Sequence, residues 1–185
     1  MDERNNGDAK RRRTARTILA IDRNRESLHA LAYRLGQRGH LTVLADPGAE
    51  ALGLIAGRGF DLLLLDMTIP GLSALHVLRS LRAAYDTADL PVILTSAPND
   101  RDSALAAFAA GADDCIASGH DPEVLAARIE RALERAARVA DLKRRNLALD
   151  ARVAARAIEL GEARTELAVA RDDRLRLQRA LGSRV

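Results

Sequence analysis

Five short apolar runs, separated by segments with helical spacing, constrain the fold of this chain more than any other feature. Consecutive apolar residues bounded by polar ones are typical of strands buried on both faces of a sheet. Repeated strand–helix units favour right-handed crossovers and one parallel sheet covered by helices on both faces. The sequence therefore predicts an α/β fold with a doubly wound five-stranded parallel sheet. The expected strands are Thr17–Ile21, Leu41–Ala45, Leu62–Leu65, Pro91–Leu94 and Cys115–Ala117.

The segments between these runs carry signals for helix starts. Asparagine and aspartate side chains accept hydrogen bonds from the first turn of a helix, and proline is tolerated there because its missing N–H is not needed. A glycine follows several of the segments, as is typical of helix ends. We expect helices to begin near Asn24, Pro47, Leu75, Asp100 and Pro122, with the second one closed by Gly57 and Gly59.

Composition limits the class of protein. The chain has 185 residues, of which 48% are hydrophobic and only 2% aromatic, so its core must consist of Leu, Ala, Val and Ile. A single cysteine, Cys115, excludes an internal disulfide and a CxxC metal site. No apolar stretch approaches the ~20 residues of a membrane span, and the N-terminus is charged. We expect a cytoplasmic protein, and the lack of a phosphate loop or GxSxG element argues against most motif-defined enzymes.

The net charge of +3 conceals three regions of different charge. Residues 1–16 carry six Lys or Arg and three Asp or Glu, residues 17–122 carry eight and thirteen, and residues 123–185 carry fifteen and ten. The first region has the composition of a disordered basic tail. Nucleic-acid binding through the basic ends is a weaker alternative, because no helix-turn-helix is visible and the C-terminal arginines are interleaved with acids.

Three of the apolar runs are followed by a residue suited to phosphoryl chemistry: Asp22, Asp66 and Thr95. The carboxyl ends of parallel strands share one rim of the sheet, where such folds bind ligands. Two carboxylates at this rim can hold Mg²⁺ together with a phosphate oxygen, and one of them can act as a nucleophile toward a phosphoryl group. The competing interpretation is that these aspartates only cap the following helix or loop.

Residues 17–138 resemble the receiver domain of two-component response regulators, which has a CheY-like (flavodoxin-like) fold with strand order 2-1-3-4-5. The resemblance implies that Asp66 is the phosphoacceptor and Thr95 the switch hydroxyl. It also implies an Mg²⁺ site formed by Asp22, Asp66 and the backbone carbonyl of Met67. The matching segments are residues 18–22, 62–71, 91–97 and 111–114.

The sequence departs from the receiver pattern at three positions. Receivers usually have two adjacent acids after the first strand, and Arg23 takes the second place here. The lysine expected after the fifth strand is replaced by Ser118, and Cys115 occupies the place of the usual aromatic switch residue. The two lysines of the chain, Lys10 and Lys143, lie outside the domain, so no shift of alignment restores the missing cation.

Two interpretations of Arg23 remain open. In the first, Arg23 is a substitute cation whose guanidinium binds the phosphoryl group in place of the missing lysine. In the second, Arg23 pairs with Asp22 or Asp66 at rest and occupies the place of the metal. The second interpretation describes a pseudo-receiver with one constitutive conformation.

The C-terminal segment has the heptad pattern of a coiled coil. Ten of the thirteen core positions from Val139 onward are apolar, over six heptads. The exceptions are Asn146, which favours a parallel dimer, and two arginines that weaken the seam. A single helix that folds back on the domain would need a break, which the sequence does not offer before Gly161. The core positions are 139, 142, 146, 149, 153, 156, 160, 163, 167, 170, 174, 177 and 181.

Charges beside the seam agree with a parallel pair of helices. Each exposed pair contributes only about 0.3–0.5 kcal/mol, so the pairs select orientation more than they stabilise. The segment 142–160 also resembles the signalling-helix linkers that join receivers to output domains. The expected interchain pairs are Arg145–Asp150, Glu159–Arg164 and Glu166–Arg171, with one clash between Arg138 and Lys143.

The sequence thus predicts three parts: a disordered basic tail at 1–16, a receiver domain at 17–138, and a coiled-coil extension at 139–185 that continues the last receiver helix. We expect a signalling protein, not a metabolic enzyme. Asp66 would accept a phosphoryl group from a histidine kinase or phosphotransfer protein. A parallel homodimer through 139–181 would pass the signal to a downstream protein effector. The alternative is a phosphorylation-independent pseudo-receiver that acts as a dimeric scaffold.

Overall fold

The computed structural model describes residues 15–46, 53–55, 59–69 and 71–182. These residues form a five-stranded parallel sheet with the order β2-β1-β3-β4-β5. The predicted doubly wound α/β fold and its strand order are therefore confirmed. The first two strands have the predicted bounds, and the other three differ from the prediction by one or two residues. The strands are β1 (Thr17–Ile21), β2 (Leu41–Ala45), β3 (Leu62–Asp66), β4 (Val92–Ser96) and β5 (Asp114–Ala117).

Four of the helices are α1 (Arg25–Gln37), α3 (Ala74–Ala83), α4 (Arg101–Ala109) and α5 (Pro122–Gly182). Side chains accept hydrogen bonds from the first turn of three of them, as expected for N-caps: Asn24 from Ser27 N–H, Ser73 from His76 N–H and Asp100 from Ser103 N–H. The helix predicted to begin at Pro47 lies mostly outside the described residues, although residues 53–55 are helical. The predicted basic tail lies almost entirely outside them as well.

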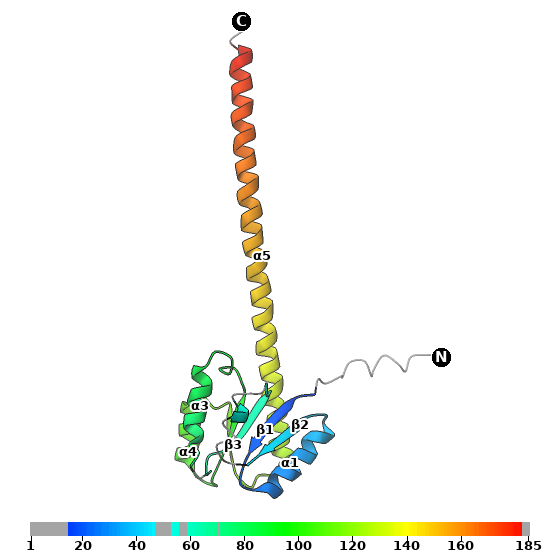
Figure 1. Ribbon diagram of the computed structural model, residues 1–185, viewed down its shortest axis with the longest axis vertical. Coiled ribbons are helices and arrows are strands. Elements are labelled where there is room, and N and C mark those ends of the chain that lie inside the picture. The colour runs from blue at the N-terminus through cyan, green and yellow to red at the C-terminus, as the bar shows by residue number, and fades with distance from the viewer. Residues whose placement is uncertain (1–14, 47–52, 56–58, 70, 183–185) are drawn as a thin grey trace, which may run out of the picture. The chain divides into compact units, whose positions relative to one another are not determined.

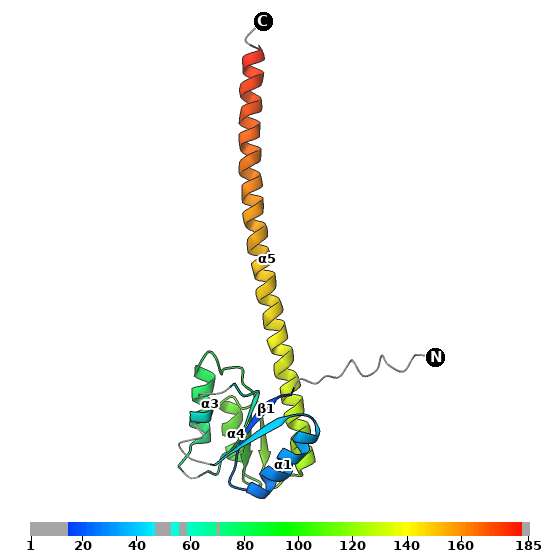
Figure 2. The ribbon, with the colours of Figure 1, turned by 45° about the vertical axis from the view of Figure 1, so that its right-hand side comes forward.

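The sheet lies between two layers of helices (Figures 1 and 2). One core cluster joins the sheet to α1 and the first turns of α5, and a second joins it to α3 and α4. Leu62 and Leu64 of β3 belong to the first cluster, whereas Leu63 and Leu65 belong to the second, because successive side chains of a strand face opposite sides. Burying each leucine contributes about 1.5–3 kcal/mol, so four buried leucines hold β3, and the Asp66 that ends it, firmly in place.

Helix α4 is anchored much more weakly than its neighbours. Ala107 is its one buried residue, while Leu105 and Phe108 are about half exposed. By contrast, α1 buries three leucines against the sheet. Alanine removes little apolar surface from water, so α4 gains little free energy from packing.

The chain divides into two compact units, Met1–Ala137 and Arg138–Val185. In the first unit, α5 buries Leu125, Ile129 and Leu133 in the core. In the second unit, α5 continues without a break past Gly161, the first position at which the sequence offered an interruption. The helix ends at Gly182. None of the helices in the described ranges combines the length and apolarity needed to cross a lipid bilayer.

Candidate functional site

Asp66 and Thr95 lie side by side at the carboxyl ends of β3 and β4. They are register partners, and the Met67 N–H donates to the Thr95 carbonyl oxygen over 2.8 Å. Both side chains are buried, with 4% of each residue exposed. Because paired residues on parallel strands are about 4.8 Å apart and face the same side, the carboxylate and the hydroxyl are neighbours.

Asp22 follows β1 on the other side of Asp66. The last residue of β1, Ile21, pairs with Leu65, so the next position along each strand brings Asp22 beside Asp66. Burial raises the pKa of Asp22, and the negative charge of Asp66 raises it further, whereas the Asn24 N–H that bonds its carboxylate opposes the shift. Three strand ends thus bring two carboxylates and one hydroxyl to a single rim, as the sequence predicts.

Arg23 reaches into this rim and contacts Asp66 both directly and through Thr68. Its Nε lies 3.9 Å from Asp66 Oδ2, and its Nη2 donates to Thr68 Oγ1 over 2.9 Å. The Thr68 hydroxyl in turn donates to Asp66 Oδ2 over 2.7 Å, and the Thr68 N–H donates to Asp66 Oδ1 over 2.9 Å. Of the two aspartates considered for Arg23 in the sequence, it is Asp66 that lies within ion-pair distance.

The hydroxyl of Thr95 is exceptional among buried polar atoms of the described residues. Of the buried side-chain nitrogen and oxygen atoms there, only Thr95 Oγ1 and Thr42 Oγ1 have no hydrogen-bond partner. An unsatisfied buried hydroxyl costs about 1–3 kcal/mol, so most proteins avoid one. At this rim, the Thr95 hydroxyl can therefore donate a hydrogen bond to a ligand oxygen that lies beside Asp66.

Small side chains, Ser118 and Cys115, stand at the two positions where the resemblance to receivers predicts a lysine and an aromatic residue. Ser118 follows β5, is exposed, and donates its backbone N–H to the Ser96 carbonyl oxygen over 2.7 Å. Cys115 is half-buried in β5, and its thiol lies 3.9 Å from the Ser96 hydroxyl. Burial raises the pKa of this thiol. Serine carries no charge, so among the described residues the cation within ion-pair distance of Asp66 is Arg23.

Among the described residues, no three His, Cys, Asp or Glu side chains gather where they could hold a metal ion. A metal at the rim would depend on the two carboxylates of Asp22 and Asp66, with its other ligands from backbone carbonyls, such as that of Met67, and from the phosphoryl group. This donor set consists of hard oxygen atoms, and Mg²⁺ is commonly held by one or two carboxylates plus phosphate. The chemistry of the rim therefore fits Mg²⁺.

Thr68 was not predicted as a site residue. Its position could have been inferred from local sequence alone. An aspartate often accepts a hydrogen bond from the backbone N–H two residues later, and this turn places Thr68 against Asp66. Asp22 makes the same turn with Asn24. A second residue outside the prediction is Asp46, which follows β2 and forms an ion pair with Arg25.

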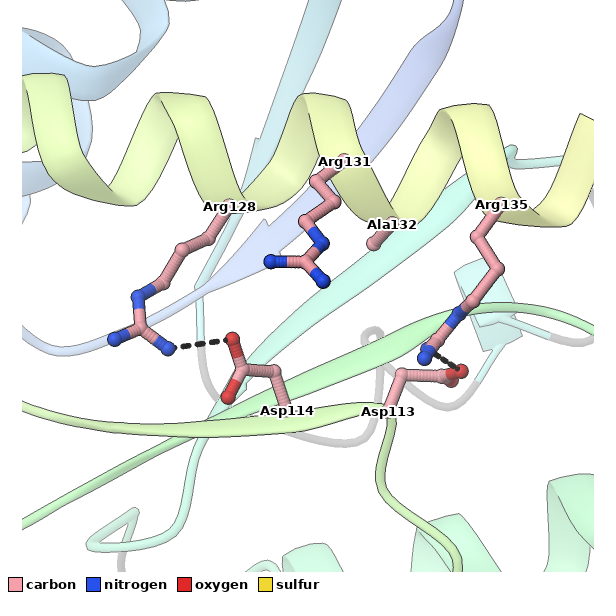
Figure 3. A pocket seen from close by; sticks show the side chains of 6 residues that line it. All are labelled: Asp113, Asp114, Arg128, Arg131, Ala132 and Arg135. Atoms are coloured by element: carbon pink, nitrogen blue, oxygen red, sulfur yellow. Dashed lines mark hydrogen bonds and ion pairs between the residues drawn. The ribbon is translucent and has the colours of Figure 1, made fainter.

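A separate charged pocket lies at the opposite, amino end of β5, against α5 (Figure 3). Arg128 pairs with Asp114 and Arg135 pairs with Asp113, and the Arg131 side chain extends between these two pairs. Asp113 is also the acceptor for Arg82 of α3 and for the backbone N–H at the start of β4. The pocket therefore joins α3, β4, β5 and α5, and it takes no part in the rim that holds Asp66.

A sequence model described as the response regulator receiver domain matches residues 18–130, more than half of the chain. The chain belongs to the response regulator receiver family. This confirms the resemblance drawn from the strand-end aspartates and the segments that follow them.

The receiver domain has close counterparts among characterised proteins. It is 37% identical over 118 residues to the response regulator MprA of Mycobacterium leprae, covering 64% of this chain and 51% of that protein. It is 32% identical over 120 residues to the phosphate regulon transcriptional regulatory protein PhoB of Pseudomonas aeruginosa, covering 65% and 52%. The chain thus spans about half the length of these curated relatives.

Solved structures agree with this assignment. The receiver domain of a signal transduction histidine kinase from Syntrophus aciditrophicus matches 65% of this chain and 91% of its own, with a TM-score of 0.59 and 27% identity. The match thus covers nearly the whole of an independent receiver domain and about two thirds of this chain.

Proposed function

We propose that this protein is a cytoplasmic response regulator that accepts a phosphoryl group on Asp66 from a histidine kinase or phosphotransfer protein. The observation that carries the proposal is the convergence of Asp66 with a second carboxylate and with a buried hydroxyl that has no partner among the described residues. A purely structural rim would satisfy that hydroxyl internally or replace it by an apolar side chain.

The transfer is a nucleophilic substitution at phosphorus. A carboxylate oxygen of Asp66 attacks and forms the new O–P bond, the bond between phosphorus and the donor nitrogen breaks, and its electron pair returns to the donor imidazole. With acetyl phosphate the leaving group is acetate. The product is an acyl phosphate, and the Thr95 hydroxyl donates to one of its phosphoryl oxygens, which relieves the unsatisfied donor of the resting state.

Asp22, Asp66 and the Met67 carbonyl are the groups that we propose for holding Mg²⁺. The ion, when bound, supplies positive charge opposite the phosphoryl oxygens. The guanidinium of Arg23 supplies a second positive charge from the chain itself and takes over part of the role of the lysine that Ser118 replaces. A planar guanidinium binds phosphoryl oxygens through two parallel N–H groups, which suits this substitution.

We further propose that residues 139–181 form a parallel two-stranded coiled coil that passes the signal to a protein effector. Apolar side chains at the heptad core are well exposed in the single chain, Leu142 at 65%, Val153 at 68% and Leu160 at 53%. A second copy would cover them and contribute roughly 25 cal/mol for each Å² of apolar surface removed from water. In the single chain the flanking Arg145 pairs with Asp141, and the flanking Glu159 pairs with Arg156 of the seam. Such exposed pairs exchange partners at little cost.

The alternative is a pseudo-receiver that works as a dimeric scaffold without phosphorylation. The contact that favours it is the resting ion pair between Arg23 and Asp66, which puts a cation where receivers usually bind a metal. The pair is long and Arg23 is 54% exposed, so its release costs little, and we favour the phosphoryl-accepting function.

Incubation with acetyl phosphate and Mg²⁺, followed by intact-mass measurement and Phos-tag electrophoresis, tests the proposal. We expect one added phosphoryl group in the wild type and none in Asp66→Ala. Sedimentation of both proteins, with and without the donor, then tests the relay. A change confined to the wild type supports it. An unlabelled wild type, under conditions that label an ordinary receiver, leaves the scaffold as the function.

A further inference from the structure

The link between Arg23 and the acceptor carboxylate runs mainly through Thr68. Arg23 Nε is 3.9 Å from Asp66 Oδ2, which is too far for a hydrogen bond. The Thr68 hydroxyl, however, accepts from Arg23 at 2.9 Å and donates to Asp66 at 2.7 Å, so it bridges the two charged groups. A hydroxyl that accepts from a guanidinium is polarised and becomes a better donor to a carboxylate.

Thr68 also occupies both oxygens of Asp66, Oδ1 through its backbone N–H and Oδ2 through its hydroxyl. One lone pair on each carboxylate oxygen is therefore engaged in the resting state, which makes both oxygens weaker nucleophiles toward phosphorus. We propose that Arg23, Thr68 and Asp66 form a latch, with Thr68 as its positioning residue, that holds the acceptor closed until a phosphoryl donor arrives. The inference rests on the proposed function of Asp66.

The exposure of the two ends of the latch explains how it opens. Asp66 is buried, with 5% of its side chain exposed, whereas Arg23 is 54% exposed and Thr68 is exposed. An approaching phosphoryl group carries more negative charge than one carboxylate and competes for the guanidinium. Once Arg23 turns to the donor, the Thr68 hydroxyl loses its polarising partner and rotates away, which frees Oδ2. The same arginine thereby closes the resting site and recruits the donor that opens it.

Rates of labelling at acetyl phosphate concentrations well below saturation test the latch, because the donor itself opens it on binding. Thr68→Val removes the hydroxyl with little change of shape, and we expect labelling about tenfold faster than in the wild type, the effect of one hydrogen bond to a charged group. Thr68→Ser keeps the hydroxyl and should stay close to the wild-type rate. In an Arg23→Gln background the acceleration by Thr68→Val should shrink severalfold, because the polarising partner is already gone. Equal rates for Thr68→Val and wild type, or an undiminished effect without Arg23, would overturn the latch.

A measurement that needs no phosphorylation separates failure of the latch from failure of the proposed function. Arginine side-chain NMR of ¹⁵N-labelled protein reports guanidinium rotation and hydrogen exchange at Arg23. We expect both to be several-fold slower in the wild type than in Thr68→Val, while Arg25, which pairs with Asp46 at the neighbouring strand end, stays unchanged as the matched control. A difference confined to Arg23 in a protein that never becomes labelled would retain the latch and reject the phosphoacceptor. No difference at Arg23 would reject the latch whatever the labelling shows.

Discussion

Thr95 lies beside Asp66 across the β3–β4 pair, yet its buried hydroxyl has no hydrogen-bond partner in the described ranges. Valine has nearly the same shape and lacks the unsatisfied donor. We therefore expect Thr95→Val to raise the free energy of unfolding by about 1 kcal/mol in urea titrations of the unphosphorylated protein.

Thr42 on β2 is the matched control, because its buried hydroxyl is likewise without a partner among the described residues and it lies away from Asp66. Thr42→Val should gain stability by a similar amount and keep the response to phosphodonor. Thr95→Val should lose that response. A Thr95→Val protein that is less stable than the wild type would mean that the hydroxyl is satisfied in solution.

Asp22 makes the stability of the fold depend on pH. Its pKa is raised in the folded protein by burial and by Asp66, so the folded chain holds this proton more tightly than the unfolded chain does. The carboxyl therefore contributes stability below the unfolded value of 3.8, and this contribution is lost as the pH rises through the folded-state pKa. We expect Asp22→Asn to be more stable than the wild type at pH 7 without divalent cations. Urea titrations at decreasing pH should show the advantage shrinking toward zero near pH 3.8; a pH-independent advantage would contradict this assignment.

Asp113 is expected to matter more for stability than its neighbour Asp114. Asp113 accepts from Arg82, Arg135 and the Val92 N–H, so its loss leaves several donors in a partly buried place without their partner. Asp113→Ala should cost about 2 kcal/mol. Asp114→Ala removes a single, partly exposed ion pair, with Arg128, and should cost less than about 1 kcal/mol. Chemical denaturation of both variants gives the comparison, and equal losses would show that the shared contacts of Asp113 do not matter.

Leu160 and Ile158 distinguish a coiled-coil seam from a merely apolar helix. Both side chains are exposed in the single chain, at 53% and 64%, but the heptad pattern puts only Leu160 in the core. We expect Leu160→Asp to weaken dimerisation at least about 100-fold, because each chain then brings a charge into the seam. Ile158→Asp should leave the dimer intact. Sedimentation equilibrium over a range of concentrations measures the dimerisation of both variants, and circular dichroism checks that they stay helical. A wild type that is monomeric at every concentration would contradict the predicted coiled coil.

The rim of the site was predictable because a parallel sheet aligns the ends of its strands. Asp22, Asp66 and Thr95 are far apart in sequence, but each follows or ends an apolar run, and the sheet brings them together without further information. Some strands begin or end one or two residues away from the predicted positions because of local backbone hydrogen bonds. Pro91 offers only its carbonyl to the ladder, so β4 begins at Val92, and backbone hydrogen bonds from Met67 and Ser118 extend β4 through Ser96.

The contacts of Arg23 and Thr68 could not be derived from the pattern. A long side chain such as Arg23 can adopt many rotamers, and the sequence left Asp22 and Asp66 equally open as its partners. The choice depends on the turn after β3, where Thr68 folds back over Asp66 and offers its hydroxyl to the guanidinium. The coiled-coil seam of the C-terminal helix stays a prediction. A heptad pattern predicts packing against a second chain, and the structure contains a single chain.

Helix α4 follows β4 after a short connection and buries only Ala107 of its nine residues. Elements with so little packing surface open with small free energies, well below that of global unfolding. The amide protons of α4 should therefore exchange with solvent sooner than those of α1, which is anchored by three leucines. Of the helices with described bounds, α4 buries the fewest residues, and it follows the strand that carries Thr95. A small displacement of that hydroxyl can therefore shift α4 before a better-packed helix moves.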